Sequence, residues 1–203
     1  MNQFGNKIDT LLDGGRIANL IKYSQHCAPL QGYISEWGVF SGGSLEILAK
    51  YNPNKDIMAV DSFTGMPPVT DGVDFHKEHD FNMVDFSAIN GYFKMIYPPV
   101  RIVKGYIPEV FSYFDEHTRF CFSHIDLDLY KSVKDTLDFV FPRTVDGGMI
   151  LLDDYKVRST PGCEKAINEF FDERPDVEFT YRGELKYWDA EDAPSNKQYL
   201  IVK

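Results

Sequence analysis

Short apolar runs alternate along the chain with longer segments in which apolar residues recur every three or four positions. The runs, rich in β-branched and aromatic residues, predict buried strands, and the periodic segments predict helices. The predicted strands span residues 32–37, 57–60, 100–103, 120–125, 149–152, 177–181 and 199–202. The predicted helices span residues 16–27, 44–51, 86–96, 107–114 and 130–141, with a last one around 163–171. This alternation indicates an α/β fold whose mostly parallel sheet carries helices on both faces.

Glycine and proline residues mark the connections between these elements. Gly14 and Gly15 separate an N-terminal segment, residues 1–15, from the first helix, and residues 146–148 are predicted to form a turn before the fifth strand. Residues 62–85 carry no periodic pattern, and a connection of this length in a compact domain is usually a lid or a binding loop. We therefore expect one domain, residues 1–203, with a lid-like insertion over residues 62–97.

The composition fits a soluble globular protein, with 43% hydrophobic and 26% charged residues. The net charge of -10 disfavours a nucleic-acid partner and favours a cationic ligand or a metal. No apolar run reaches the roughly 18–20 residues of a membrane span, and the N-terminus lacks the basic and apolar regions of a secretory signal. Cys27, Cys121 and Cys163 are few and scattered, which predicts reduced thiols in a cytoplasmic protein.

Pairs of carboxylates follow two of the predicted strands. Asp126 and Asp128 come after the fourth strand, and Asp153 and Asp154 after the fifth. Residues i and i+2 of a strand face the same way, whereas adjacent residues point apart, so Asp153 and Asp154 can share an ion only if the chain turns there. The acids predict a site for Mg²⁺ or Ca²⁺, and zinc is disfavoured because no Cys/His set has the spacing of zinc ligands. The alternative is that the acids cap helices.

A glycine-rich turn follows the first predicted strand. Gly38, Gly42 and Gly43 allow the backbone to approach a ligand, and the helix that starts near Ser44 offers free N–H groups. Asp61 ends the second strand, where a carboxylate can accept the hydroxyls of a ribose. The spacing does not match G-x-G-x-x-G, so an NAD fingerprint is a poor fit. The alternative is an ordinary strand–helix turn with a surface acid.

A few other residues carry possible chemistry. His76 and His79 lie in the long loop, where a solvated role is favoured over gating of the substrate or base chemistry. His124, inside the fourth strand, is predicted to be a hydrogen-bonded group, either of the core or directly behind the ligands of the site. Tyr187 and Trp188 follow the sixth strand as candidates for lining the substrate site.

These features together resemble the macrocin O-methyltransferase family, also called the TylF/MycF family. The resemblance covers about residues 15–188. Its most specific part is Asp126-x-Asp128-x-Tyr130 followed by Gly147-Gly148 and Asp153-Asp154-Tyr155. The other matching segments are residues 36–44, 61–67, 105–109, 124–132 and 161–166.

The resemblance implies a Rossmann-like class I methyltransferase fold with a mostly parallel, seven-stranded sheet. It also implies S-adenosylmethionine- and Mg²⁺-dependent O-methylation of a sugar or a glycosylated small molecule. The methionine end of the cofactor would lie near Glu36 and Ser44, the ribose at Asp61, and the adenine near Ser62 and Phe63. The implied cofactor-binding set is Glu36, Gly38, Phe40, Gly42, Ser44, Asp61, Ser62 and Phe63.

The same resemblance assigns the acids. Asp126, Asp153 and Asp154 would bind Mg²⁺ or another hard divalent cation, and Asp128 would be the general base that takes the proton of the sugar hydroxyl. Antibiotic-tailoring members have a longer N-terminal segment, whereas little precedes Arg16 here. We therefore expect a smaller or more exposed acceptor, such as a nucleotide sugar or a glycan. A homodimer of this chain is also among the expected partners.

Two other functions remain as alternatives. A Mg²⁺-dependent phosphotransferase or phosphatase could use a D-x-D motif, although in that class the motif follows the first strand and here it follows the fourth. A non-catalytic S-adenosylmethionine-binding protein would have no use for the complete set of acids.

Overall fold

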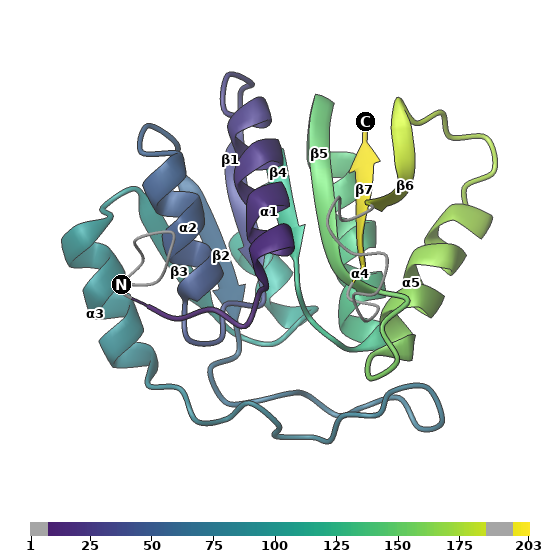
Figure 1. Ribbon diagram of the computed structural model, residues 1–203, viewed down its shortest axis with the longest axis horizontal. Coiled ribbons are helices and arrows are strands. Elements are labelled where there is room, and N and C mark those ends of the chain that lie inside the picture. Colours follow the sequence, from purple (N-terminus) through teal and green to yellow (C-terminus); the bar gives the residue numbers. More distant parts are fainter. Residues whose placement is uncertain (1–7, 186–196) are drawn as a thin grey trace.

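The computed structural model describes residues 8–185 and 197–203. Within these residues seven strands form one sheet in the order β3-β2-β1-β4-β5-β7-β6, with helices on both of its faces (Figure 1). The strands are β1 (Tyr33–Trp37), β2 (Ile57–Asp61), β3 (Val100–Lys104), β4 (Phe120–Ile125), β5 (Thr144–Tyr155), β6 (Tyr181–Leu185) and β7 (Lys197–Val202). The predicted α/β class and seven-stranded sheet are confirmed.

Helices connect the strands. The helices of the described chain are α1 (Gly14–Cys27), α2 (Gly43–Tyr51), α3 (Phe86–Ile96), α4 (Tyr130–Val140) and α5 (Pro161–Asp172), with 3₁₀ turns η1 (Glu109–Tyr113) and η2 (Phe141–Arg143). None of these helices is long and apolar enough to cross a membrane.

The strand order places the carboxyl ends of β1 and β4 side by side. β1 pairs in parallel with β2 on one side and with β4 on the other, and Trp37 lies opposite Ile125 at the end of the pair. The chain continues from β1 towards one edge of the sheet and from β4 towards the other. A crevice at such a switch point is where open parallel sheets bind their ligands. β7 is antiparallel to both β5 and β6.

Two hydrophobic cores hold the three layers together. Alternate residues of the strands enter opposite cores: Leu151 of β5 packs on the face covered by α1, α2 and α3, whereas Ile150 and Leu152 pack on the face covered by α4 and α5. This alternation follows from the two-residue repeat of a strand. Because both faces are buried, the strands appear in the sequence as nearly continuous apolar runs.

The sixth strand lies further along the chain than predicted. The sequence favoured residues 177–181, but β6 begins at Tyr181, which pairs with Val202. Phe179 precedes the strand and packs against Phe141 and Phe171, with ring centroids 5.4 and 5.1 Å apart. The β-prone residues before Tyr181 therefore cover α5 and η2 instead of joining the sheet.

The predicted turn at residues 146–148 was also wrong, because these residues lie inside β5. The pairing of β4 with β5 shifts in register between Phe120 and Phe122, and Gly147 has φ +74°. Gly147 donates to the carbonyl of Lys203 (2.9 Å), and Lys203 donates to that of Gly148 (3.0 Å). The glycines therefore make a bulge that stays hydrogen-bonded within the sheet.

Residues 62–85 form a long connection without helix or strand, as predicted, and run along the edge of the sheet at which the parallel strands end (Figure 1). Hydrogen bonds fix its course: Met66 N–H donates to the Asp80 carbonyl (2.9 Å), and His79 N–H donates to that of Met66 (3.0 Å). Asp74 Oδ1 accepts from the Tyr130 N–H at the start of α4 (2.8 Å). The loop is thus closed on itself by its own hydrogen bonds and anchored to the start of α4.

Candidate active site

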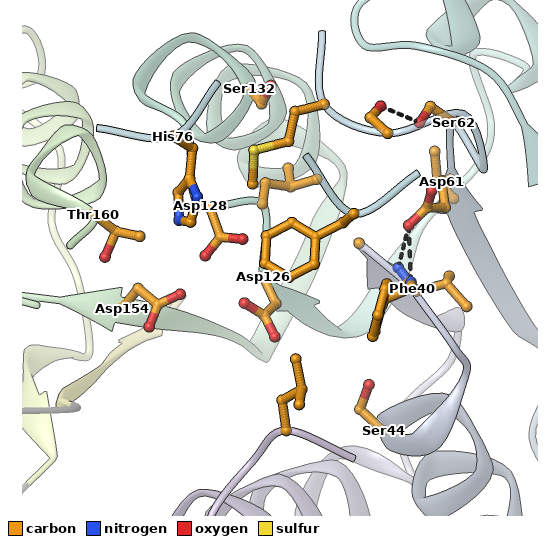
Figure 2. Close-up of a pocket in the computed structure, with 18 of the residues that line it drawn as sticks. Phe40, Ser44, Asp61, Ser62, His76, Asp126, Asp128, Ser132, Asp154 and Thr160 are labelled. Carbon is orange, nitrogen blue, oxygen red and sulfur yellow. Dashed lines mark hydrogen bonds between the residues drawn. The ribbon is translucent and has the colours of Figure 1, made fainter. Parts of the chain in front are cut away.

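A cavity of about 350 Å³ opens at the carboxyl ends of β1 and β4. Its walls come from separate parts of the chain: the turn after β1, the ends of β2 and β3, the loop after β4, the end of β5, the long connection and the segment before α1. Figure 2 shows Asp126, Asp128 and Asp154 on one side of the cavity and Phe40, Asp61 and Ser62 on the other. The two predicted groups of site residues therefore share one space.

Gly38 allows the two halves of the site to meet. It has φ +94°, and a Cβ placed on it would lie 1.8 Å from the Asp126 carbonyl oxygen. The Asp126 N–H donates to the Trp37 carbonyl (2.8 Å), so β1 and β4 stay paired up to the rim of the cavity. Only glycine fits both the left-handed backbone and this close approach.

Asp61 holds the glycine turn in place. Its Oδ2 accepts from the N–H groups of Val39 (2.8 Å) and Phe40 (2.9 Å), and its Oδ1 accepts from the Phe63 N–H (2.7 Å). An ionised carboxylate offers about four acceptor positions, so about one remains for a ribose hydroxyl. The side chain thus serves the turn first and can still contact a ligand.

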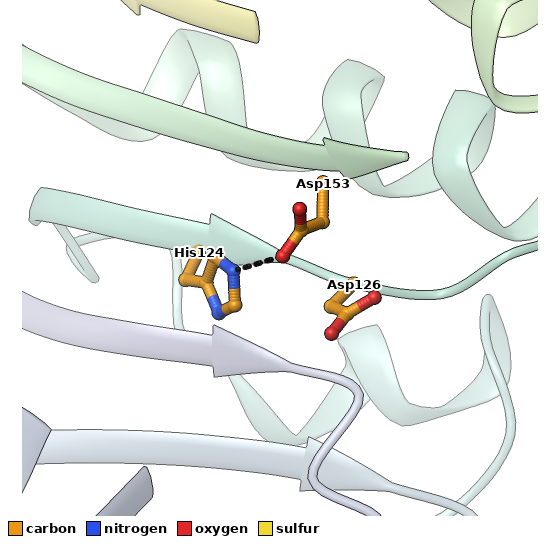
Figure 3. A group of neighbouring side chains, drawn as sticks. All are labelled: His124, Asp126 and Asp153. Atoms are coloured by element: carbon orange, nitrogen blue, oxygen red, sulfur yellow. Dashed lines mark hydrogen bonds and ion pairs between the residues drawn. The ribbon is translucent and has the colours of Figure 1, made fainter. Parts of the chain in front are cut away.

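A buried chain of polar groups connects the turn with the acids. Ser44 Oγ donates to Glu36 Oε1 (2.5 Å), and the two ring nitrogens of His124 lie 3.3 Å from Glu36 Oε1 and 3.3 Å from Asp153 Oδ2. Figure 3 shows His124 pointing at Asp153, with Asp126 beside them. The prediction that His124 is a hydrogen-bonded group is confirmed. Burial lowers the pKa of His124, but the carboxylates of Glu36 and Asp153 outweigh burial and raise it well above its ordinary value.

The four acids converge in two overlapping groups. Oxygen atoms of Asp126, Asp128 and Asp154 lie within 4.8 Å of one another, and so do ligand atoms of His124, Asp126 and Asp153. Asp128 and Asp154 both have φ +60°, and the pairing of β5 with β7 shifts in register after Leu152. The chain therefore turns at Asp154, but Asp153 and Asp154 fall in different groups, which share only Asp126. Among the described residues, the predicted metal set of Asp126, Asp153 and Asp154 does not form one such group.

The proximity of these acids changes their proton affinities. Burial, and then the charges of Asp153 and Asp154, raise the pKa of Asp126 well above its ordinary value. Burial and the charge of Asp126 do the same to the pKa of Asp128. Burial raises the pKa of Asp153 as well, but the hydrogen bond and the charge of His124 outweigh it and lower that pKa overall. Like charges this close favour a bound cation.

The donor set fits a hard divalent cation. Carboxylate oxygens of Asp126, Asp128 and Asp154, from two strand ends, lie within 4.8 Å of one another, and Asp153 Oδ1 is buried without a hydrogen-bond partner among the described residues. Burying a carboxylate oxygen without a hydrogen bond costs free energy, unless a nearby cation or hydrogen-bond donor interacts with that oxygen. Magnesium and calcium prefer such oxygen ligands.

Arg16 is a site residue that the sequence interpretation missed. It lies in the first turn of α1, and its Nη1 lies 3.5 Å from Asp153 Oδ1 and 3.8 Å from Asp154 Oδ1. Burial lowers its pKa, but Asp153, Asp126 and Asp154 outweigh burial and raise it. One signal was available: Arg16 precedes Leu20 by four positions, so it shares the buried face of the predicted helix.

Most of the predicted residues line the cavity directly, and some do not. Those at its wall are Gly38, Phe40, Ser44, Asp61, Ser62, Asp126, Asp128 and Asp154. Glu36 and Asp153 lie behind the wall: Glu36 reaches it through its hydrogen bond with Ser44, and Asp153 through its ion pair with Arg16. Gly42 caps α2, and the Phe63 ring packs in the core against Phe86, with centroids 5.0 Å apart.

The two loop histidines named as candidates lie in different places relative to the cavity. His76 lines the cavity, whereas the His79 side chain is 65% exposed and is not among the lining residues. Tyr187 and Trp188 lie outside the described residues. The segment before α1 adds Leu11 and Leu12 to the wall, which its weak sequence pattern did not predict.

Comparison with known proteins identifies the family of the chain. The family model of macrocin O-methyltransferase (TylF) matches residues 12–178. Mycinamicin III 3''-O-methyltransferase from Micromonospora griseorubida is 25% identical over 187 residues, which cover 80% of this chain and 70% of that protein. A tetracenomycin-C rhamnosyl 4'-O-methyltransferase from Streptomyces olivaceus is 27% identical over 156 residues, or 68% of this chain and 58% of that protein.

Solved structures share the fold. The O-methyltransferase NovP superposes with a TM-score of 0.76 at 19% identity, covering 96% of this chain and 81% of that one. The calicheamicin methyltransferase CalS11 gives a TM-score of 0.73 at 19% identity, covering 92% and 78%. Both the fold and the matched residues agree with the resemblance seen in the sequence. The chain therefore belongs to the macrocin O-methyltransferase (TylF) family of S-adenosylmethionine-dependent O-methyltransferases.

Proposed function

We propose that this enzyme transfers the methyl group of S-adenosylmethionine to a hydroxyl of a sugar or a glycosylated small molecule, with Mg²⁺ bound by the acids. The observation that carries the proposal is the convergence of the glycine turn and the carboxylates on one cavity. A nucleoside cofactor and a cation held side by side are what metal-assisted methylation of a hydroxyl requires.

The cofactor would lie across the ends of β1 and β2. Glu36 and Ser44, which share a hydrogen bond, would face its methionine end at the start of α2. The Asp61 carboxylate would accept a hydrogen bond from a ribose hydroxyl. Ser62 and the backbone of Phe63 would lie beside the adenine. Gly38, Phe40 and Gly42 shape the backbone against which the sulfonium would rest.

The acceptor would bind on the acid side. Asp126, Asp153 and Asp154 would hold Mg²⁺, which when bound lowers the pKa of a coordinated hydroxyl and fixes its geometry. The hydroxyl oxygen attacks the methyl carbon while the carbon–sulfur bond breaks and S-adenosylhomocysteine leaves. Asp128 would accept the hydroxyl proton, and burial together with the charge of Asp126 raises its pKa, which makes its ionised form a stronger base.

The names of the relatives support a sugar as acceptor. They include a mycinamicin 3''-O-methyltransferase, a rhamnosyl 4'-O-methyltransferase and a TDP-rhamnose 3'-O-methyltransferase. The buried free thiols Cys27, Cys121 and Cys163 also suit a cytoplasmic enzyme.

The test is an acceptor screen with labelled S-adenosylmethionine over methyl glycosides, nucleotide sugars and glycosylated phenols. Each reaction is run with Mg²⁺, with EDTA, and with EDTA followed by excess Mg²⁺. The proposal predicts methylation of a sugar hydroxyl that EDTA abolishes and Mg²⁺ restores. Methylation that ignores EDTA would remove the metal from the mechanism, and phosphate release from a phosphomonoester would favour a phosphatase instead.

A further inference from the structure

Arg16 places a buried positive charge beside two of the proposed metal ligands. Its side chain is 9% exposed, and Nη1 lies 3.5 Å from Asp153 Oδ1 and 3.8 Å from Asp154 Oδ1. Both distances exceed those of a good hydrogen bond. Asp153 Oδ1 and Arg16 Nε have no hydrogen-bond partner among the described residues. The contact is therefore electrostatic, and it leaves the Asp153 oxygen available to another cation.

The other nitrogens of Arg16 connect to the segment before α1. Nη2 donates to the Leu11 carbonyl (2.9 Å), and Nε lies 3.4 Å from Asp13 Oδ2. This segment covers the start of α2, since a Cβ on Gly43 would lie 2.2 Å from the Asp9 carbonyl oxygen. Arg16 thus joins the acids to the part of the chain that covers the expected methionine end of the cofactor.

We propose that Arg16 competes with the divalent cation for the charge of Asp153 and Asp154 and so sets the metal affinity of the site. The inference rests on the proposed function, which makes these two acids metal ligands. A guanidinium does not lose its proton in proteins, so Arg16 can yield to a metal only by moving. The competition weakens metal binding and keeps the ion exchangeable.

The same geometry offers Arg16 an alternative partner. Asp13, already in contact with Nε, has a side chain that is 51% exposed and can take more of the guanidinium charge when a metal neutralises the other two carboxylates. Because Nη2 holds Leu11, such a movement shifts the wall of the cofactor cavity. Metal binding and the position of residues 8–13 are therefore coupled.

The test is a titration with Mn²⁺ at pH 8, followed by the electron paramagnetic resonance signal of the free ion. Arg16→Gln is expected to bind Mn²⁺ about tenfold more tightly than the native protein, because a neighbouring positive charge is removed where solvent screens it weakly. Arg16→Lys keeps the charge and is expected to stay within about threefold of native. Arg101→Gln, on the exposed side of β3, is the matched control and leaves the affinity unchanged.

Equal or weaker Mn²⁺ binding by Arg16→Gln overturns the inference and leaves the metal role intact. Calorimetry with S-adenosylhomocysteine on the native protein separates the two questions: cofactor binding without Mn²⁺ binding removes both the metal and the competition, but not the cofactor site. If Arg16→Gln does not fold, the native protein is titrated with Mg²⁺ while the nuclear magnetic resonance signal of Arg16 Nε–H is followed. The proposal predicts that this signal shifts with the same Mg²⁺ dependence as metal binding. A signal that has not moved at saturation overturns the proposal.

Discussion

Asp153 illustrates how strongly the site depends on single side chains. The residue is 3% exposed, accepts from Gln198 as well as His124, and faces Arg16 with its other oxygen. Each neighbour carries a positive charge or a donor, so the pKa of this carboxylate is lowered, whereas the pKa values of Asp126 and Asp128 are raised by burial and by the neighbouring acids. It is the acid best prepared to bind a cation at neutral pH.

Asp153→Asn tests that role with little change in size. We expect it to abolish methyl transfer while the affinity for S-adenosylhomocysteine stays within a few-fold, because Asp153 lies on the acid side of the cavity. Asp71→Asn, on the exposed part of the long connection, serves as the control. Normal turnover by the Asp153 variant would show that the metal role is wrong.

Asp61→Ala addresses the other half of the cavity. Removing the carboxylate leaves the Val39 and Phe40 N–H groups without their acceptor, at a cost of about 1–3 kcal/mol in the free energy of unfolding. The lost ribose contact should also weaken S-adenosylhomocysteine about tenfold, as measured by calorimetry. Asp56→Ala, on an exposed loop, is the control. Unchanged cofactor affinity would exclude Asp61 from the site.

Cys27 gives a pH dependence that does not involve the acids. Burial raises the pKa of its thiol to about 12, so the folded state favours the protonated form. The corresponding stability is fully present below the ordinary thiol pKa of about 8.5 and is lost as pH rises from there towards 12. The advantage in unfolding free energy of the native protein over Cys27→Ala should therefore shrink above pH 8.5. An advantage that grows with pH would contradict this assignment.

The glycine turn matters at the scale of elements, because it sets how closely two strands and a helix meet. Gly38 lies where β1, β4 and the cavity join, and its φ of +94° is unfavourable for any other residue. Asp61, at the end of β2, then fixes the course of the turn through two backbone N–H groups. β2 thus stabilises the junction of β1 and β4.

Gly38→Ala should cost at least about 2 kcal/mol in unfolding free energy, since the new Cβ meets the Asp126 carbonyl oxygen and the backbone is left-handed. Gly91→Ala in α3 is the matched control: nothing lies within 4 Å of its added Cβ. That change should stabilise the protein by about 0.5–1 kcal/mol, because alanine favours a helix interior. Urea unfolding measures both, and equal effects would argue against the role given to Gly38.

The elements also show how far the sequence can be interpreted. Strands buried on both faces have a strong apolar pattern, so β1 to β4 were predicted within a residue or two. Gly147 and Gly148 misled the prediction because a bulge and a turn use the same residues, and only the pairing with Lys203 distinguishes them. Phe179 misled it because aromatic packing against α5 and pairing in a sheet favour the same side chains.

At the scale of the whole molecule, the strand order determines the site. Because β1 and β4 are neighbours, residues 88 positions apart, Glu36 and His124, come within 3.3 Å, and the acids after β4 and β5 meet the turn after β1. The sequence predicted this convergence from the ends of the strands. The spacing to Leu20 could place Arg16 on the buried face of its helix, but not beside the acids, because that position follows from the way α1 packs beside β5. The sequence also did not predict that the Phe63 ring belongs to the core.

The most direct measurement is a crystal structure with S-adenosylhomocysteine and Mn²⁺, in which anomalous scattering locates the metal. Our account predicts one Mn²⁺ ligated by Asp126, Asp153 and Asp154, with the cofactor in the same cavity between Gly38 and Asp61. A metal bound elsewhere, or a cofactor lying away from the ends of β1 and β4, would contradict it.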